Sequence, residues 1–169
     1  HPCYKPTLWG SGAWAISAVK GSESVGMGGE DKGLTLPQVV ERYGADFLGK
    51  ANSQKFGHDF PLLIKFIDAR QDLSIQVHPN DELSAKRHGK MGKNEMWYVV
   101  DAEPGSKLYM GFRREVSATE LYERCHAGTL EEVLNVVTPH NGDAFLIPAG
   151  LVHSASDGVV VAEIAESSD

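Results

Sequence analysis

The stretch of residues 73–78, Leu-Ser-Ile-Gln-Val-His, carries side chains that could bind a metal ion. We expect a β-strand here, in which Ser74, Gln76 and His78 share one face. A strand in a compact β protein usually turns apolar side chains inward, so three polar side chains in register indicate a lined site. Gln76 and His78 can each give an electron pair to a metal ion.

Two further electron-pair donors, Glu95 and His153, lie in patterns of their own. Glu95 opens a predicted strand of aromatic and β-branched residues over 95–101. His153 follows a buried strand and the bend Pro148-Ala149-Gly150, which can turn its side chain toward the mouth of a barrel. A lone histidine is more often a surface or hydrogen-bonded residue, but this pattern favours a ligand. Lys93 would share the face of Glu95, although it could also be a solvated loop lysine.

Composition limits the class of protein. The chain has 169 residues and 41% hydrophobic content, which fits one domain with a real core. The formal net charge is −7 and no run of Arg and Lys occurs, which disfavours nucleic acid as a partner. No run of about 18 apolar residues predicts a membrane span, and no apolar signal segment opens the chain. Cys3 and Cys125 stand far apart, which indicates a reducing, cytoplasmic compartment.

The expected elements divide the chain into two parts of one structural unit. Residues 1–60 hold short strands, loops and one helix from Thr35 to Leu48, followed by a polar loop. Residues 61–169 alternate short strands with tight turns, apart from a small helical insertion over 117–135. This pattern predicts a mainly β protein, a barrel or a sandwich. The abrupt end at Asp169 suggests a truncated protein. Further strands are expected over 62–68, 107–112, 135–138, 144–147 and 158–164.

The run from Gly142 to His153, Gly-x5-Pro-x-Gly-x2-His, matches the second motif of the cupin superfamily. The first cupin motif gives His-x-His and then Glu, and Gln76-x-His78 with Glu95 stands in its place here. That combination resembles the type I mannose-6-phosphate isomerases (phosphomannose isomerases), and it implies a cupin-type (jelly-roll) β-barrel. The motifs follow the family order through nearly the whole chain: Trp9-Gly10, Trp14-Ala15-Ile16-Ser17, Gln76-Val77-His78-Pro79, Lys93-Asn94-Glu95-Met96-Trp97-Tyr98-Val99, and Ala162-Glu163-Ile164 with Ser167-Ser168-Asp169.

Two features depart from the family pattern. Only Ser11-Gly12-Ala13 separates the Trp-Gly and Trp-x-Ile-Ser elements, where the family has a longer loop. The family also continues to an arginine, thought to be catalytic, about four residues beyond its Ser-Asp pair, and longer members carry a second cupin-like half. The sequence ends at Asp169, so neither feature can be assigned here.

The resemblance implies one zinc ion bound by Gln76, His78, Glu95 and His153. Two imidazoles, one carboxylate and one amide oxygen form a mixed set that zinc accepts, and a catalytic site leaves one position open. Iron, manganese, nickel or cobalt would also suit these ligands. Taken singly, Gln76 could be a surface strand residue and Glu95 a salt-bridge partner of Lys93 or Arg87. Four histidines that lie outside the motifs are interpreted as solvated or structural: His58, His88, His126 and His140.

The resemblance also implies the reaction, the interconversion of mannose 6-phosphate and fructose 6-phosphate through a cis-enediol. A metal would stabilise the enediolate charge, and a nearby base would move a proton between C1 and C2. Glu95 would be a poor base because its lone pairs go to the metal. Candidates for proton transfer are Lys93, Asp169 and Glu163, which the strand after His153 could return to the site.

Three residues are candidates for contact with the sugar phosphate. Lys65 and Ser74 suit the phosphate end, because a phosphate needs a cation and hydroxyl or backbone donors. Trp14 could form a wall of the sugar pocket or lie in the core.

Two other functions stay open. A metal-dependent cupin dioxygenase generally uses three histidines, or two histidines and a carboxylate, and Gln76 speaks against it. A non-catalytic sugar-binding or regulatory cupin is compatible with a truncated chain, although Lys93 and Glu95 favour an enzyme.

Overall fold

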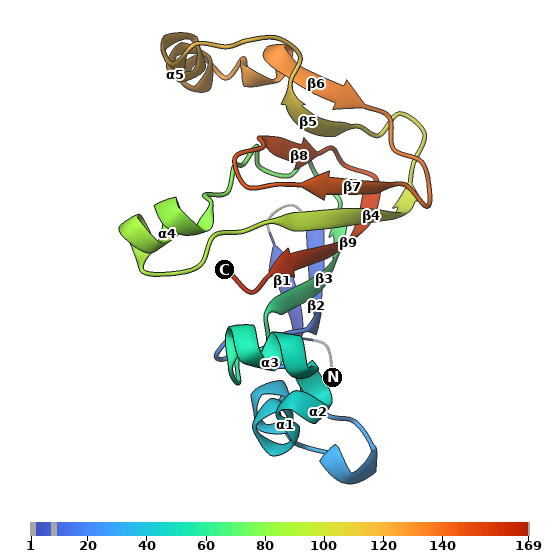
Figure 1. The fold of residues 1–169 in the computed structure, drawn as a ribbon. Helices are drawn as coiled ribbons and strands as arrows, with labels where there is room; N and C mark the ends of the chain where they lie inside the picture. The colour runs from blue at the N-terminus through green and yellow to red at the C-terminus, as the bar shows by residue number, and fades with distance from the viewer. Residues whose placement is uncertain (1–2, 8–9, 169) are drawn as a thin grey trace.

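The computed structural model describes residues 3–7 and 10–168, and two antiparallel sheets form its body (Figure 1). The larger, six-stranded sheet has the order β1-β2-β3-β9-β4-β7, and the smaller, three-stranded sheet has the order β6-β5-β8. This arrangement confirms the predicted mainly β architecture. The strands are β1 Cys3–Thr7, β2 Gly10–Ile16, β3 Leu62–Ala69, β4 Glu95–Ala102, β5 Leu108–Phe112, β6 Leu134–Val137, β7 Ala144–Ile147, β8 His153–Ala155 and β9 Val159–Glu166.

The hydrophobic core joins the two sheets. Val99 and Val161 of the larger sheet and Leu108 of the smaller sheet belong to one buried cluster. On β9 every second residue is buried, and Glu163 continues the row that begins with Val159 and Val161. Alternate residues of a strand face the same side of a sheet, so β9 leads from the apolar core to a charged interior position.

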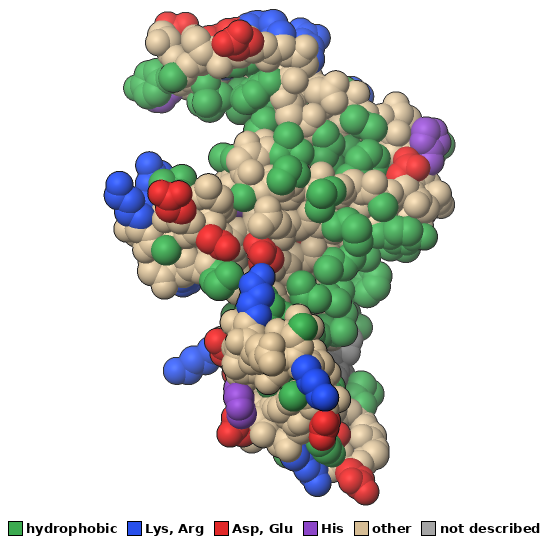
Figure 2. Space-filling view, in the orientation of Figure 1, with side chains coloured by type: hydrophobic (Ala, Val, Ile, Leu, Met, Phe, Trp, Pro, Cys, Tyr) green, Lys and Arg blue, Asp and Glu red, His purple; other side chains and the backbone are tan. Residues whose placement is uncertain are grey.

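The outer face of the larger sheet is apolar as well. Figure 2 shows apolar side chains gathered over β4 and β7, where Met96, Tyr98 and Leu146 are between 36% and 74% exposed. The inner face of the same sheet carries Glu95 and Glu163, both nearly buried. The usual distribution is therefore reversed at this end of the sheet, which indicates that the inward carboxylates serve a purpose other than packing.

The N-terminal part contains three helices, α1 Leu36–Tyr43, α2 Ala45–Leu48 and α3 Lys50–Phe56. Thr35 caps α1 through a capping box, as expected. The expectation of one continuous helix to Leu48 is wrong, because Gly44 adopts φ +50° and ends α1. The expected polar loop after it is also wrong. The segment that forms α3 has only Ala51 and Phe56 as apolar residues, so no helical period of apolar residues marks it as a helix.

The remaining helices lie within the second part of the chain. Helix α4, Asp81–His88, starts at the cap Asn80. The sequence predicts only a short helical turn over residues 81–86, so the helix extends two residues beyond that prediction. The predicted insertion holds α5, Ala118–Ala127, capped by Ser117, and a short 3-10 helix at Leu130–Val133. A further 3-10 turn, Gly29–Asp31, lies in the N-terminal part. Among the described residues, no helix has the length and apolar character needed to cross a membrane.

Six predicted strands are confirmed, and each of their ends lies within two residues of the observed one: β3, β4, β5, β6, β7 and β9. The strand expected over 73–78 is wrong. This segment runs along β8 but bonds to it only at Leu73 and in one isolated bridge between Gln76 and His153, so no regular ladder forms. Strand β2 belongs to the first expected part of the chain and β3 to the second, and the two strands pair with each other. The division of the chain at residue 60 stays a prediction.

Candidate metal centre

Three metal-binding side chains converge in the interior at one end of the larger sheet. Glu95 begins β4 and is 3% exposed, His153 begins β8 and is fully buried, and His78 precedes α4. The Oε1 atom of Glu95 lies 2.7 Å from Nε2 of His153 and 3.4 Å from Nε2 of His78. All three ligand atoms lie within 4.8 Å of one another, so these residues could hold one metal ion.

Main-chain hydrogen bonds position the segments that carry these ligands. Gln76 and His153 exchange both N–H···O bonds, at 3.0 and 2.9 Å. Side chains directly opposite in such a pair lie on the same side, so Gln76 faces the site beside His153. The expected bend is present, with the N–H of Leu151 donating to Pro148 at 3.1 Å. Within it, Gly150 adopts φ +89°, which glycine tolerates, and its N–H donates to the carbonyl of His78 at 2.8 Å.

The contacts of His153 determine which nitrogen carries its proton. Its Nδ1 lies 2.8 Å from the carbonyl oxygen of Leu151, which can only accept, so Nδ1 is protonated. The lone pair of Nε2 then faces the carboxylate of Glu95. In the part of the chain that the structure describes, Glu95 Oε1 and the Nε2 atoms of His78 and His153 have no hydrogen-bond partner. The lone pairs of these atoms repel one another. A cation between the atoms, or a second proton on an imidazole, removes this repulsion. Nitrogen and oxygen donors of this kind fit a divalent metal ion.

A chain of alternating charges runs beside the metal-binding residues. Lys65 on β3 stands opposite Glu163 on β9, with Nζ and Oε1 3.3 Å apart. The same Oε1 lies 3.3 Å from Nζ of Lys93, which in turn lies 3.1 Å from Oε2 of Glu95. All four side chains are at most 13% exposed. We refer to Lys65, Glu163, Lys93 and Glu95 as the buried charge row.

Burial and neighbouring charges act in opposite directions on the pKa values in this row. Burial alone would raise the pKa of Glu95, but its contacts with His153 and His78 and the charge of Lys93 hold that pKa well below its usual range. Burial alone would lower the pKa of Lys93, but the carboxylates of Glu163 and Glu95 raise it above its ordinary value. At neutral pH, Glu95 is therefore an anion and Lys93 a cation.

A cavity of about 590 Å³ opens in front of the buried charge row. This volume is suitable for a small polar molecule. The structure brings four of the sequence-predicted site residues to its wall: Lys65, Gln76, His78 and Lys93. The other lining residues are Pro79, Ser84, His88, Lys90 and Ser168.

Two sequence-predicted residues, Ser74 and Trp14, do not line this cavity, and a third lies outside the described residues. Ser74 is exposed and does not line this cavity. Trp14 is 7% exposed, and the Nζ atom of Lys65 lies over its ring, 4.8 Å from the centroid. This cation–π contact stabilises the charge of Lys65. Asp169, like the motif residue Trp9, lies outside the described residues.

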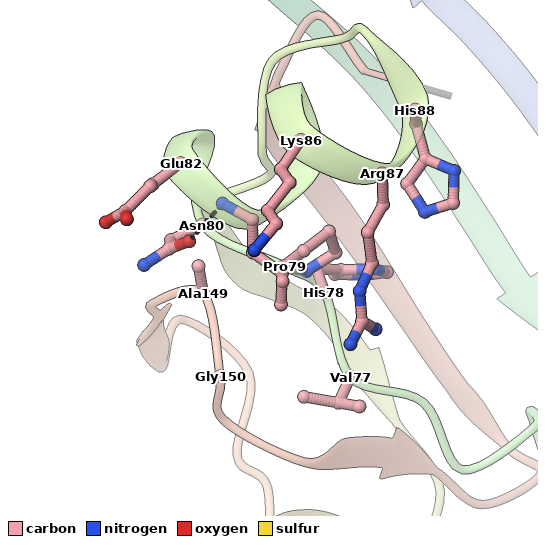
Figure 3. A pocket seen from close by; sticks show the side chains of 11 residues that line it. Val77, His78, Pro79, Asn80, Glu82, Lys86, Arg87, His88, Ala149 and Gly150 are labelled. Atoms are coloured by element: carbon pink, nitrogen blue, oxygen red, sulfur yellow. Dashed lines mark hydrogen bonds between the residues drawn. The ribbon is translucent and has the colours of Figure 1, made fainter.

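A second cavity, of about 680 Å³, lies between α4 and the bend at Ala149 and Gly150. Figure 3 shows Lys86 and Arg87 of α4 reaching toward the side of His78. His88, interpreted from the sequence as solvated or structural, lines both cavities. The approach to the candidate site from α4 is therefore basic.

Sequence reasoning missed three residues around the site. Trp97 is fully buried and presents its ring edge-on to His153, with centroids 5.4 Å apart. Its position two residues after Glu95 could have revealed it, because both then share one face of β4. His88 and Lys90 had no such signal, because His88 ends α4 and Lys90 follows it, beyond the helical turn expected from the sequence.

Comparisons with known proteins agree with this geometry. The family described as phosphomannose isomerase type I, catalytic domain, matches residues 10–125, which include Lys65, Lys93 and Glu95. The chain is 34% identical over 185 residues to mannose-6-phosphate isomerase ManA of Bacillus subtilis, covering 99% of this chain and 57% of that protein. It is also 34% identical over 156 residues to mannose-6-phosphate isomerase of Streptococcus mutans, covering 92% and 48%. The chain thus spans about half the length of these curated relatives.

Solved structures show the same fold. The crystal structure of mannose 6-phosphate isomerase from Bacillus subtilis superposes with a TM-score of 0.89 at 30% identity, over 100% of this chain and 58% of that chain. A mutant phosphomannose isomerase from Salmonella typhimurium gives a TM-score of 0.79 at 17% identity, over 100% and 68%, and at that identity shows the fold alone. The predicted cupin-type fold is confirmed by these likenesses.

Proposed function

The chain belongs to the type I phosphomannose isomerases, and on that premise we propose that the protein interconverts mannose 6-phosphate and fructose 6-phosphate as a metal-dependent aldose–ketose isomerase. The observation that carries the proposal is the cluster of His78, Glu95 and His153, which could hold a metal ion, beside the ion pairs of Lys93 and Glu163. His78 and Lys93 connect this group to the cavity, because both line its wall. The names of the matched relatives support the same reaction and substrate.

Zinc is the metal that we propose, held by His78, Glu95 and His153 with the amide oxygen of Gln76 as a fourth ligand. The three buried acceptor atoms without hydrogen-bond partners among the described residues support this donor set. When bound, the cation supplies Lewis-acid chemistry, withdrawing electron density from substrate oxygens and making the C2 proton more acidic. Iron, manganese, nickel and cobalt are compatible with the same ligands.

We assign the proton transfer to Glu163. Its Oε1 lies 3.3 Å from the Nζ atoms of Lys65 and Lys93, both of which line the cavity, whereas the carboxylate of Glu95 lies against the histidines and would be occupied by the metal. In the aldose-to-ketose direction, Glu163 would take the proton from C2 and return it to C1 of the cis-enediol. Lys93, whose pKa is raised, would stay protonated and stabilise negative charge on the substrate oxygens.

Lys65 is the better of the two candidates for the phosphate end, because it lines the cavity and Trp14 supports it from beneath. Ser74 is exposed and would need the substrate to reach around Gln76. Asp169 stays a prediction as a further proton carrier. A small sugar phosphate is the partner class that we propose; the sequence disfavours nucleic acid and predicts no membrane span. The free cysteines Cys3 and Cys125 are compatible with the expected cytoplasmic location.

The two rival functions are less well supported. A cupin dioxygenase has no use for the neighbouring lysines of the buried charge row, and Gln76 does not belong to its usual ligand sets. A non-catalytic sugar-binding cupin does not need Glu163 and Lys93 buried beside a metal cluster, since burying charges has a large desolvation cost.

A coupled assay tests the proposal. Purified protein is supplied with mannose 6-phosphate, and the formation of fructose 6-phosphate is followed with and without a chelator. We expect turnover that the chelator abolishes and that added Zn²⁺ restores. Absence of metal-dependent turnover in a full-length protein would sink the isomerase assignment, whereas oxygen consumption with Fe²⁺ would support the dioxygenase.

A further inference from the structure

The side chain of Asn94 joins segments that are distant in the sequence. Its Nδ2 donates to Oε2 of Glu166 at 2.9 Å, and its Oδ1 accepts from the N–H of Ala149 at 2.9 Å. Its main chain adds two more bonds to the end of β9, since its N–H donates to the same Oε2 at 2.8 Å and its carbonyl accepts from the N–H of Glu166 at 3.0 Å. One residue thus makes four hydrogen bonds to two partners.

Asn94 and its partner Ala149 both lie next to segments that carry the candidate ligands. Asn94 immediately precedes Glu95. Ala149 precedes Gly150, whose N–H donates to the carbonyl of His78, and the same bend leads into His153. The amide of Asn94 is therefore a side-chain link between the segment that carries Glu95 and the bend that contacts His78 and leads into His153.

We propose that Asn94 is a positioning residue for the metal centre. It would act through Glu95 on one side and through the bend at Ala149 and Gly150 on the other, without touching the metal or the substrate. This inference rests on the metal binding in the proposed function. Ligands held in the correct geometry bind a metal more tightly, and loss of an outer partner typically lowers metal affinity by about 10- to 100-fold.

The environment of Asn94 separates positioning from stability. Asn94 is exposed, so water can replace a hydrogen bond that is lost there, and folding should be little affected. The ligand atoms of Glu95 and His153, in contrast, are buried and only 2.7 Å apart, so a small shift of either segment changes the metal site directly.

The chain contains a matched control. Asn141 makes the same pair of side-chain bonds, with its Nδ2 donating to Asp101 at 2.9 Å and its oxygen accepting from the N–H of Ala102 at 3.0 Å. Asp101 lies six residues from Glu95 along β4, a separation of about 20 Å at the usual rise of a strand. Asn94→Asp and Asn141→Asp therefore make the same chemical change, the first beside the metal centre and the second far from it.

The substitution can also be rescued. Asn94→Asp keeps the acceptor for Ala149 but sets a second carboxylate against Glu166. Adding Glu166→Gln supplies an amide that can donate to the new carboxylate, while its oxygen still accepts from the main-chain N–H of residue 94. Asn94→Ala removes both side-chain bonds without adding charge, and it carries the test if Asn94→Asp does not fold.

The experiment measures Co²⁺ binding by chelator competition and by the visible absorption of the bound ion, together with the melting temperature. We expect N94D to lower the affinity by about 10-fold or more and to change the spectrum, N94A to lower it by about 10-fold, and N94D/E166Q to recover most of the loss. N141D should bind Co²⁺ as the unsubstituted protein does, with a change in melting temperature similar to that of N94D.

Each outcome decides between the proposals. If N94D or N94A binds Co²⁺ with unchanged affinity and spectrum, or if N94D/E166Q binds no better than N94D, the inference about Asn94 is wrong while metal binding stands. If the unsubstituted protein binds no Co²⁺ or Zn²⁺, the metal dependence of the proposed function fails, and the positioning role fails with it.

Discussion

Two groups of four charged side chains in this protein each contain two cations and two carboxylates, but one group is buried and the other is much more exposed to solvent. The buried charge row alternates two lysines with two glutamates. On the helical insertion, an exposed charge cluster alternates two arginines with two glutamates: Arg114, Glu120, Arg124 and Glu132. Its side chains are between 23% and 65% exposed, whereas no member of the buried row exceeds 13%.

The two groups differ in how they form and in what they contribute. The exposed charge cluster is drawn from residues 114–132 and includes a pair one helical turn apart, so local spacing is sufficient to form it. Exposed pairs of this kind contribute little to stability. The buried charge row needs β3, β9 and β4 in register, and removing its charges from water is costly. A costly group is retained for the chemistry of its site. Three substitutions and one pH titration test that contrast.

The largest expected effect is on folding stability. Glu163→Gln leaves Lys65 and Lys93 buried without their shared carboxylate, and we expect the free energy of unfolding to fall by about 3 kcal/mol. The loss should lie at the low end for a broken buried pair because Lys93 keeps Glu95. Urea denaturation in the presence of chelator measures it. The control is Glu120→Gln in the exposed charge cluster, and equal losses in the two variants would break the comparison.

The next effect is on metal binding. Glu95→Gln removes the carboxylate ligand at nearly constant volume, and we expect affinity for Zn²⁺ to fall by at least about 100-fold, more than the loss of an outer partner causes. Chelator competition gives the dissociation constant. Glu132→Gln, which changes the same type of residue in the exposed charge cluster, should leave that constant unchanged. A Glu95→Gln variant with full zinc affinity would contradict the assignment of the site.

A smaller effect tests how Lys93 is held. A Cβ atom at Gly92 would lie 2.4 Å from the carbonyl carbon of Asn80 and 2.6 Å from the nitrogen of Asp81, in main chain that cannot easily move. We expect Gly92→Ala to destabilise the fold by about 1–3 kcal/mol and to lower turnover through displacement of Lys93. Thermal unfolding and the isomerase assay measure the two effects.

The control for this substitution is Gly28→Ala. Gly28 has extended backbone, and a Cβ atom there meets no atom within 4 Å. The Gly28 variant should therefore unfold as the unsubstituted protein does. If both variants were equally stable and active, close packing at Gly92 would have no role in holding the row.

The smallest effect is the pH dependence of the exposed charge cluster. Hydrogen bonds from Arg114 and Arg124 lower the pKa of Glu120 from 4.5 to about 2. Because the folded-state pKa is lowered, the contribution of Glu120 to stability is present above pH 4.5 and is lost as the pH falls from 4.5 toward 2. Screening by the surrounding solvent makes this contribution small. Side-chain NMR titration should give the low pKa, and added salt should move it toward its ordinary value; an unchanged pKa at high salt would contradict a screened surface pair.

The same contrast explains how much the sequence could predict. The insertion was predictable because Ser117 and Glu120 stand at capping distance, and most strands were predictable from alternation or apolar runs. The segment over 73–78 was not, because its pairing with β8 depends on the bend before His153 rather than on its own residues. Likewise, Gln76, His78, Glu95 and His153 could be found through motif spacing.

The partnership of Lys65 with Glu163 could not be found in that way. It follows from the register of β3 on β9, which no local pattern encodes. The role of Asn94 was hidden for a similar reason, because both of its partners are distant in the sequence.

The main-chain hydrogen bonds around the metal centre have a consequence for mutational tolerance. The proton of His153 is fixed by the carbonyl of Leu151, and His78 is held by the N–H of Gly150, so neither bond depends on the identity of a side chain other than glycine at the bend. A main-chain acceptor survives replacement of its own side chain. Residues close to the ligands can therefore change, and with them the shape of the cavity, while the ligand arrangement is inherited intact. Single substitutions near the bend could then change which small molecule the cavity admits without displacing the candidate metal-binding residues.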